Sequence, residues 1–188
     1  RNGVEMYDVY TGFKWIANVM RENEGKKNYI GGGEESYGFL CEDFVRDKDA
    51  VSACVILAEI AAWAKDQGLS LYQLLQKIYV EYGFSKEKGI SVVKKGKSGA
   101  EEIEAMMKKF RENPLTEIAG SKVTYFYDYS TLKGKDYAEN ETVTLDMPTT
   151  SNVLQYFTED NTKVSIRPSG TEPKIKFYCE VHSKVKSI

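Results

Sequence analysis

The chain has 188 residues, of which 41% are hydrophobic and 29% are charged, a composition typical of folded globular proteins rather than disordered or membrane proteins. Its formal net charge of −2 provides no general attraction for nucleic acid or anionic membranes, so neither is expected as a partner. A single histidine, His182, excludes a multi-histidine metal site.

The first part of the chain has the pattern of an α/β domain. Residues 4–9 predict a short strand, and helical spacing of apolar residues begins at Phe13. A second strand is predicted over residues 28–30, and it leads into a glycine-rich loop over residues 31–38.

Two helices are expected next. Asp49 is the predicted cap of the first, while Ser70 and Gln73 form a capping box for the second, which should end at Gly83. The polar stretch 85–89 then predicts a linker, so we place a domain boundary between residues 85 and 86.

The second part of the chain is expected to be an α+β domain. Ser98 and Glu101 predict the start of a helix. Strict alternation of side-chain types over residues 123–129 and 175–182 predicts strands of a mainly antiparallel sheet.

The loop between two of these predicted strands contains the elements of a phosphate site. Arg167 offers a planar set of donors, Ser169 and Thr171 offer hydroxyls, and Gly170 allows backbone N–H groups to turn inward. The alternative is an ordinary hairpin loop, which uses the same residue types.

The glycine-rich loop suggests a second binding element. The Glu34 carboxylate and the Ser36 hydroxyl are suited to accept hydrogen bonds from sugar hydroxyls, although a solvated acidic turn has the same composition. Lys14 lies in the first turn of its helix, where the positive end of the helix dipole makes a cation unfavourable unless an anion binds there.

Four motifs occur in the order known from one enzyme family. They are T-G-F-K at residues 11–14, G-G-E-E-S at 32–36, D-K-D at 47–49 and R-P-S-G-T-E-P-K at 167–174. Together they span nearly the whole chain, which resembles the C-terminal part of an α-D-phosphohexomutase of the phosphoglucomutase/phosphomannomutase family.

The resemblance implies two domains. Residues 1–85 would be a partial third domain, an α/β fold with a mixed sheet and flanking helices that lacks an initial β-α unit. Residues 86–188 would be the fourth domain, a TBP-like α+β fold with a mainly antiparallel sheet. The missing N-terminal domains of the same polypeptide would be partners, and the truncated edge favours self-association.

The resemblance also implies roles for individual residues. Glu34 and Ser36 would bind the sugar hydroxyls, and Lys14 would lie in the active-site cleft. The phosphate that is not being transferred would be held by Arg167, Ser169, Gly170 and Thr171.

In this family a phosphoserine gives its phosphoryl group to a sugar phosphate, and the bisphosphate intermediate reorients before the other phosphate returns to serine. The sequence contains neither the serine loop (T-x-S-H-N-P) nor the magnesium loop (D-G-D-x-D-R). We therefore expect this chain to bind a phosphosugar, to hold no metal and to be inactive alone, with magnesium bound elsewhere in the intact enzyme. A phosphopentomutase and a non-catalytic phosphate-binding module are the alternatives.

The expected location is the cytoplasm. Three cysteines at irregular spacing favour reduced thiols over a disulfide framework. The first residues lack the features of a secretory signal, and no apolar stretch approaches the roughly 20 residues that span a bilayer.

Overall fold

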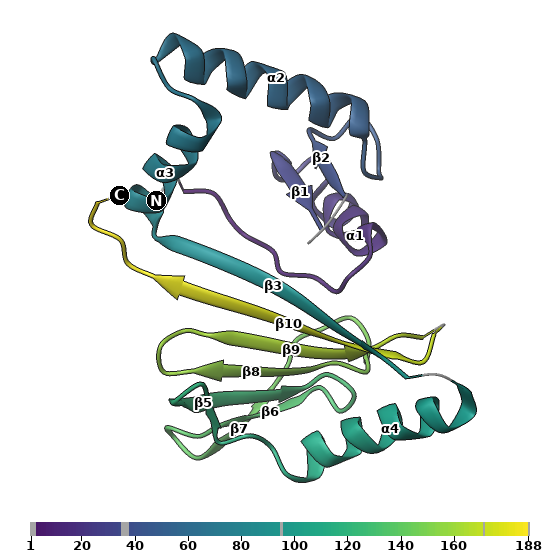
Figure 1. The fold of residues 1–188 in the computed structure, drawn as a ribbon. Helices are drawn as coiled ribbons and strands as arrows, with labels where there is room; N and C mark the ends of the chain where they lie inside the picture. Colours follow the sequence, from purple (N-terminus) through teal and green to yellow (C-terminus); the bar gives the residue numbers. More distant parts are fainter. Residues whose placement is uncertain (1–2, 35–37, 95, 171, 188) are drawn as a thin grey trace. The chain divides into compact units, whose positions relative to one another are not determined.

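The structure is a computed structural model that describes residues 3–34, 38–94, 96–170 and 172–187 (Figure 1). The chain divides into two compact units, residues 1–75 and 76–188, and each is described by itself. The expected boundary at 85/86 stays a prediction. No helix within the described ranges is long and apolar enough to cross a membrane.

The first unit is built around a small core beneath helix α1 (Phe13–Asn23). Strands β1 (Gly31–Gly33) and β2 (Phe39–Cys41) form an antiparallel pair. Phe13 and Met20, which lie on one face of α1, are buried with Leu40 of β2. The helix predicted from Phe13 is thus confirmed, because its apolar stripe covers the strand pair.

Two of the strand predictions need correction. Residues 4–9 form no strand, because this segment is largely exposed and pairs with no described strand. A local sequence pattern does not produce a strand where no other strand pairs with it. The strand predicted at residues 28–30 forms three residues later, as β1.

The two following helices are capped as the sequence predicts. Helix α2 (Ala50–Asp66) begins after Asp49, whose Oδ2 accepts a 2.7 Å hydrogen bond from Ser52 N. Helix α3 (Leu71–Tyr82) follows the reciprocal pair of the capping box, in which Gln73 N donates to Ser70 Oγ and Ser70 N donates to Gln73 Oε1. The unit division falls within α3.

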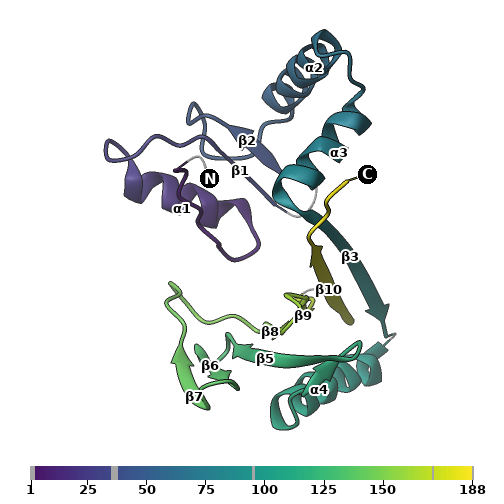
Figure 2. The same ribbon diagram turned by 90° about the vertical axis from the view of Figure 1, so that its left-hand side faces the viewer.

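The second unit is an antiparallel sheet with helix α4 (Gly96–Glu112) on one face (Figure 2). Every neighbouring pair of its described strands is antiparallel, and this confirms the expected fold class. The strands, in sheet order, are β3 (Phe84–Val93), β10 (Lys174–Ser183), β9 (Lys163–Pro168), β8 (Leu154–Thr158), β5 (Ser121–Asp128), β6 (Lys133–Asp136) and β7 (Glu141–Thr144), with β4 (Glu117–Ile118) paired to β5.

The main core lies between α4 and this sheet. Ile103 and Met107 of α4 pack with buried residues of the strands, among them Tyr156, Ile166 and Ile175. This burial fixes the β9–β10 hairpin, and with it the loop between the two strands.

Two further predictions are wrong in this unit. Residues 85–89 are not a linker but part of β3, which pairs with β10 along its whole length. Ser98 is not a helix cap, because α4 already begins at Gly96. At residues 85–89, local polarity was a poorer guide than pairing with a distant segment.

Candidate functional site

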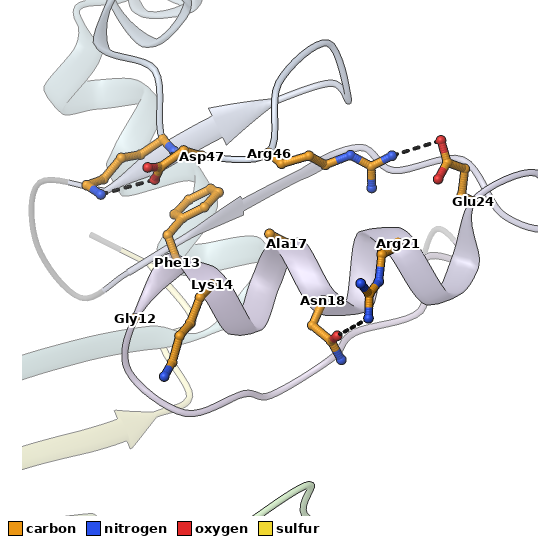
Figure 3. Close-up of a pocket in the computed structure, with 10 residues that line it drawn as sticks. Gly12, Phe13, Lys14, Ala17, Asn18, Arg21, Glu24, Arg46 and Asp47 are labelled. Carbon is orange, nitrogen blue, oxygen red and sulfur yellow. Dashed lines mark hydrogen bonds and ion pairs between the residues drawn. The ribbon is translucent and has the colours of Figure 1, made fainter.

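In the first unit, polar side chains of α1 line a cavity of about 700 Å³. Lys14, Asn18 and Arg21 follow one another along one side of the helix (Figure 3). Arg21 Nη2 donates to Asn18 Oδ1 at 3.4 Å. Lys14 makes no ion pair within the described part of the chain, and its Nζ lies 4.8 Å from the centroid of the Trp15 ring.

The start of α1 leaves this side of the cavity electropositive. Gly12, in the cap position, has φ +117° and supplies no side-chain cap, and the first turn contains no acidic residue. The free N–H groups of the first turn and Lys14 therefore present positive charge together.

The opposite wall comes from the segment between β2 and α2. Arg46 and Lys48 line the cavity there. Each is paired with a carboxylate: Arg46 with Glu24 at 2.9 Å, and Lys48 with Asp47 at 3.1 Å. The side-chain hydrogen bond from Lys48 lowers the pKa of the Asp47 carboxyl. Four cations against two carboxylates leave an electropositive cavity suited to an anion.

Glu34 lies apart from Lys14. It lines a different cavity, of about 920 Å³, between the segment of residues 3–11, α1 and β1. Its backbone N donates to Gly38 O at 2.7 Å, and its side chain lies so close to Gly38 that a Cβ there would overlap the carboxylate. Glycine at position 38 therefore leaves room for the Glu34 side chain as it is placed here.

In the second unit, hydrogen bonds within the β9–β10 hairpin hold the loop between the two strands. Ser169 N donates to Lys174 O at 2.7 Å, and Glu172 N donates to Ser169 Oγ at 3.3 Å. Glu172 is paired with Lys174 at 2.6 Å, and this hydrogen bond lowers the pKa of the Glu172 carboxyl. Outside the hairpin, Lys94 N donates to Pro173 O at 2.8 Å, so the loop is tied to the end of β3 as well.

Arg167 and Gly170 leave this loop open to a ligand. Arg167 is half-buried, and no described carboxylate lies within ion-pair distance of its guanidinium. A Cβ at Gly170 would meet nothing within 4 Å, and its φ is not left-handed. Neither packing nor backbone conformation thus requires glycine there; its small size instead leaves the backbone accessible to a bound group.

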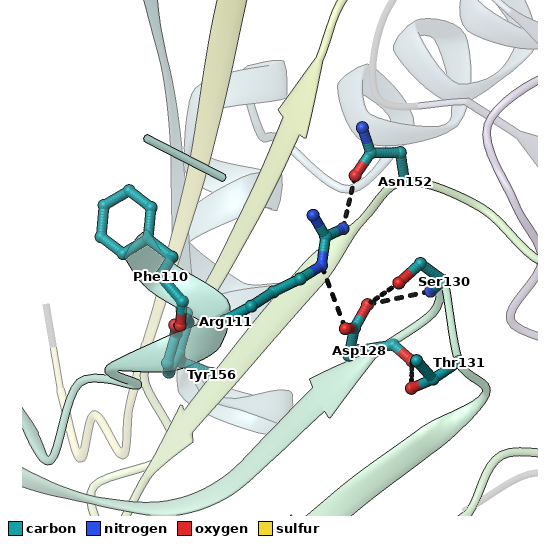
Figure 4. A network of polar contacts seen from close by, with 7 residues as sticks. All are labelled: Phe110, Arg111, Asp128, Ser130, Thr131, Asn152 and Tyr156. Atoms are coloured by element: carbon teal, nitrogen blue, oxygen red, sulfur yellow. Dashed lines mark hydrogen bonds and ion pairs between the residues drawn. The ribbon is translucent and has the colours of Figure 1, made fainter. Parts of the chain in front are cut away.

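A polar network ties the end of α4 to the end of β5 and to Asn152 (Figure 4). Arg111 Nε donates to Asp128 Oδ2 at 3.0 Å and its Nη2 to Asn152 Oδ1 at 2.5 Å, while Ser130 N and Oγ donate to Asp128 Oδ1. Arg111 and Asn152 also line a cavity of about 1050 Å³ that reaches Ser169 and Gly170. The network therefore fixes Arg111 on a cavity wall that the loop residues Ser169 and Gly170 share.

The structure brings some predicted site residues together and leaves others apart. Arg167 lies at the end of β9, and Ser169 and Gly170 follow directly in the loop, whereas Lys14 and Glu34 line different cavities of the first unit. Ser36 and Thr171 lie outside the described residues.

Sequence reasoning assigned no site role to four of the residues that line these cavities: Arg21, Arg46, Lys48 and Arg111. Lys48 stands in the D-K-D motif, and Arg21 stands seven positions after Lys14, a spacing that places both on one helix face, so both signals were present in the sequence. Arg46 and Arg111 depend on loop closure and tertiary pairing.

No metal site emerges from the described ranges. Within them, no group of three or more His, Cys, Asp or Glu side chains is arranged to hold a metal ion.

Two family models match the chain in succession. Residues 1–82 match phosphoglucomutase/phosphomannomutase, alpha/beta/alpha domain III. Residues 90–186 match phosphoglucomutase/phosphomannomutase, C-terminal domain. The chain belongs to the phosphoglucomutase/phosphomannomutase family.

Individual relatives agree with this membership. A phosphoglucomutase of Staphylococcus aureus (strain bovine RF122 / ET3-1) is 41% identical over 180 residues, or 96% of this chain, and one of Staphylococcus haemolyticus is 37% identical over 179 residues, or 95% of this chain. The match covers 32% of each relative, so the chain spans about a third of their length.

A solved structure shares the fold. The open form of pp63/parafusin, a phosphoglucomutase from Paramecium, superimposes with a TM-score of 0.62 at 19% identity, covering 99% of this chain and 30% of that protein.

Proposed function

We propose that this chain is the substrate-binding C-terminal part of a sugar phosphomutase that interconverts the 1-phosphate and 6-phosphate of a hexose. Its second unit would hold the phosphate that is not being transferred, through Arg167, Ser169, Gly170 and Thr171. Its first unit would contribute Lys14 and, at the sugar hydroxyls, Glu34 and Ser36.

The observation that carries this proposal is the half-buried guanidinium of Arg167, which has no carboxylate partner among the described residues, close in sequence to the open backbone at Gly170. A planar guanidinium and exposed backbone N–H groups are the donors that phosphate oxygens accept best. The positive cavity around Lys14 supports an anionic substrate in the first unit too. The names of the staphylococcal relatives favour a glucose phosphate over a pentose phosphate.

The proposed reaction needs groups that this sequence does not contain. A phosphoserine would give its phosphoryl group to the sugar phosphate, and the second phosphate of the bisphosphate intermediate would return to that serine after reorientation. Positioning and charge stabilisation supply most of the catalysis in phosphoryl transfer, and these are the tasks we assign to this chain. Magnesium would be held by residues outside it, so we expect the chain alone to be inactive, and we place the intact enzyme in the cytoplasm.

The binding proposal is tested by an amide NMR titration of the 188-residue chain with glucose 6-phosphate and with inorganic phosphate. Both ligands should shift the resonance of Gly170, and only the sugar phosphate should shift that of Gly33. The variant Arg167→Ala should bind at least about tenfold more weakly, because it loses charged hydrogen bonds of about 1.5–3 kcal/mol each. A dispersed spectrum that shows no change at saturating ligand contradicts the assignment.

We expect catalytic turnover only from the complete polypeptide. Comparing glucose 1-phosphate with ribose 1-phosphate as substrates of that protein separates a hexose mutase from a pentose mutase. A complete, folded and phosphorylated protein without either activity would identify a phosphate-binding module instead.

A further inference from the structure

We propose that Tyr29 is a positioning residue for Glu34, and that it acts by fixing strand β1 against helix α1. This inference rests on the proposed function and adds to its sugar site a residue outside the four sequence motifs. Glu34 remains the group that contacts the sugar, and Tyr29 acts through the backbone that carries it.

Strand β1 has no side chain of its own with which to pack. It consists of Gly31, Gly32 and Gly33, and Glu34 follows directly. Glycine inside a strand leaves the backbone with more freedom to lose on folding and contributes nothing to packing. A carboxylate that must meet sugar hydroxyls at defined positions therefore depends on other residues to fix β1.

The strand register turns Gly32 and Glu34 toward α1. Gly32 is directly opposite Leu40 of β2, whose side chain is buried in the core beneath α1. Opposite residues in an antiparallel pair share a face, and so do residues two positions apart in one strand. The Glu34 side chain lies against Gly38, two positions before Leu40, which agrees with this face.

Tyr29 and Ile16 occupy the space that a side chain at position 32 would need. A Cβ at Gly32 would lie 2.6 Å from the Tyr29 hydroxyl oxygen and 3.0 Å from Ile16 Cγ2. The Tyr29 hydroxyl also donates to Leu40 O at 3.3 Å, and both Tyr29 and Ile16 pack against the core beneath α1. Burial raises the pKa of this hydroxyl, so it remains a donor at neutral pH. One side chain thus contacts both strands of the hairpin and the core of the helix.

This contact sets the spacing between the two described groups of the proposed site in the first unit. Lys14 stands two positions before Ile16 in α1, and Glu34 stands two positions after Gly32. Protein interiors are close-packed, so a larger residue at position 32 would move β1 away from α1 and displace Glu34 with it. Burial alone could be satisfied by alanine at position 32 and phenylalanine at position 29. The glycine and tyrosine found here instead bring the backbone of β1 close to the helix.

The test is an amide NMR titration of the 188-residue chain and its variants with glucose 6-phosphate and with inorganic phosphate. Gly32→Ala should raise the Kd for glucose 6-phosphate at least about fivefold. The Kd for inorganic phosphate should not change, because the β9–β10 loop lies in the second unit. Tyr29→Phe removes the hydroxyl that the new Cβ would meet, so adding it to Gly32→Ala should recover part of the lost affinity. Gly31→Ala is the matched control, since a Cβ there lies at ordinary contact distances, 3.4 Å from Leu40 O and 3.7 Å from the Phe39 ring.

A second pair of variants covers the case in which Gly32→Ala unfolds the first unit. Tyr29→Ala should weaken the binding of glucose 6-phosphate but not of inorganic phosphate, and Tyr29→Phe, which keeps the ring, should bind more tightly than Tyr29→Ala. If folded Tyr29→Ala binds glucose 6-phosphate like the unmodified chain, or if Gly31→Ala loses as much affinity as Gly32→Ala, the inference fails while the proposed function stands. If glucose 6-phosphate does not shift the Gly33 resonance of the unmodified chain, the sugar site and the inference fail together.

Discussion

At the scale of single residues, the cationic side chains near the candidate sites fall into two groups, those paired with a carboxylate and those without such a partner among the described residues. Lys163, Lys174 and Arg46 are each paired with a carboxylate, and such pairs are ordinary surface structure. Lys14 and Arg167 have no such partner among the described residues. Motif and helix position sufficed to select Lys14 and Arg167 from sequence.

Tyr156 should make the stability of the second unit depend on alkaline pH. Its side chain is fully buried, its hydroxyl donates to Phe110 O at 3.0 Å, and burial raises its pKa to about 12. The unfolded chain, with a tyrosine pKa near 10, releases this proton first. The contribution of Tyr156 is therefore complete below pH 10 and declines as the pH rises toward 12.

Urea unfolding of the unmodified chain and of Tyr156→Phe at pH 8, 10 and 11.5 checks this dependence. Loss of the hydrogen bond should make the variant about 1 kcal/mol less stable at pH 8. The advantage of the unmodified chain should disappear above pH 10 and reverse by pH 11.5, because deprotonation of the unfolded tyrosine then costs the unmodified chain more than the hydrogen bond contributes. A constant difference over this range would contradict the assignment. Other tyrosines titrate in both proteins, so the comparison isolates Tyr156.

At the scale of elements, local signals located the helices better than the strands. The caps at Asp49 and Ser70 are formed by side chains and backbone three positions apart, so adjacent sequence contains the whole signal. Residues 85–89 look like a linker because they are polar, yet they form a strand because β10 pairs with them. Such pairing depends on a segment far away in the sequence.

The contact between β5 and β6 depends on a glycine. A Cβ at Gly134 would overlap the ring of Tyr127 and lie 2.9 Å from Phe126 O. Gly134→Ala should therefore force the strands apart and cost about 1–3 kcal/mol, measured by urea unfolding. Gly89→Ala is the matched control in a strand, since a Cβ there meets nothing within 4 Å. Equal effects of the two substitutions would show that space beside Tyr127 is not limiting.

At the scale of the whole molecule, α2 presents an unusual amount of apolar surface. Val51, Val55 and Trp63 are 74%, 53% and 55% exposed. Exposed apolar patches of this kind mark surfaces that another segment covers, and relatives about three times as long contain further chain. For the 188-residue chain by itself we expect self-association through this helix.

Sedimentation velocity over a range of protein concentrations tests that expectation. The unmodified chain should sediment faster as its concentration rises, and Val55→Glu should suppress this increase by placing a charge on the apolar surface. Ala138→Glu adds the same charge at an exposed turn and should behave like the unmodified chain. A concentration-independent monomer would refute self-association, and suppression by both variants would point to net charge rather than to α2.

The pairing of β3 with β10 also has a consequence for synthesis on the ribosome. The partners in this pair stand roughly 80–100 positions apart in the chain, a separation that slows folding because a long loop must close first. At about 5–20 residues per second, β3 would leave the ribosome roughly 4–20 s before β10 does. During that interval Val92, which packs on the core in the finished sheet, is exposed next to an unpaired strand edge. Nascent chains of this protein should therefore need protection by chaperones until β10 emerges.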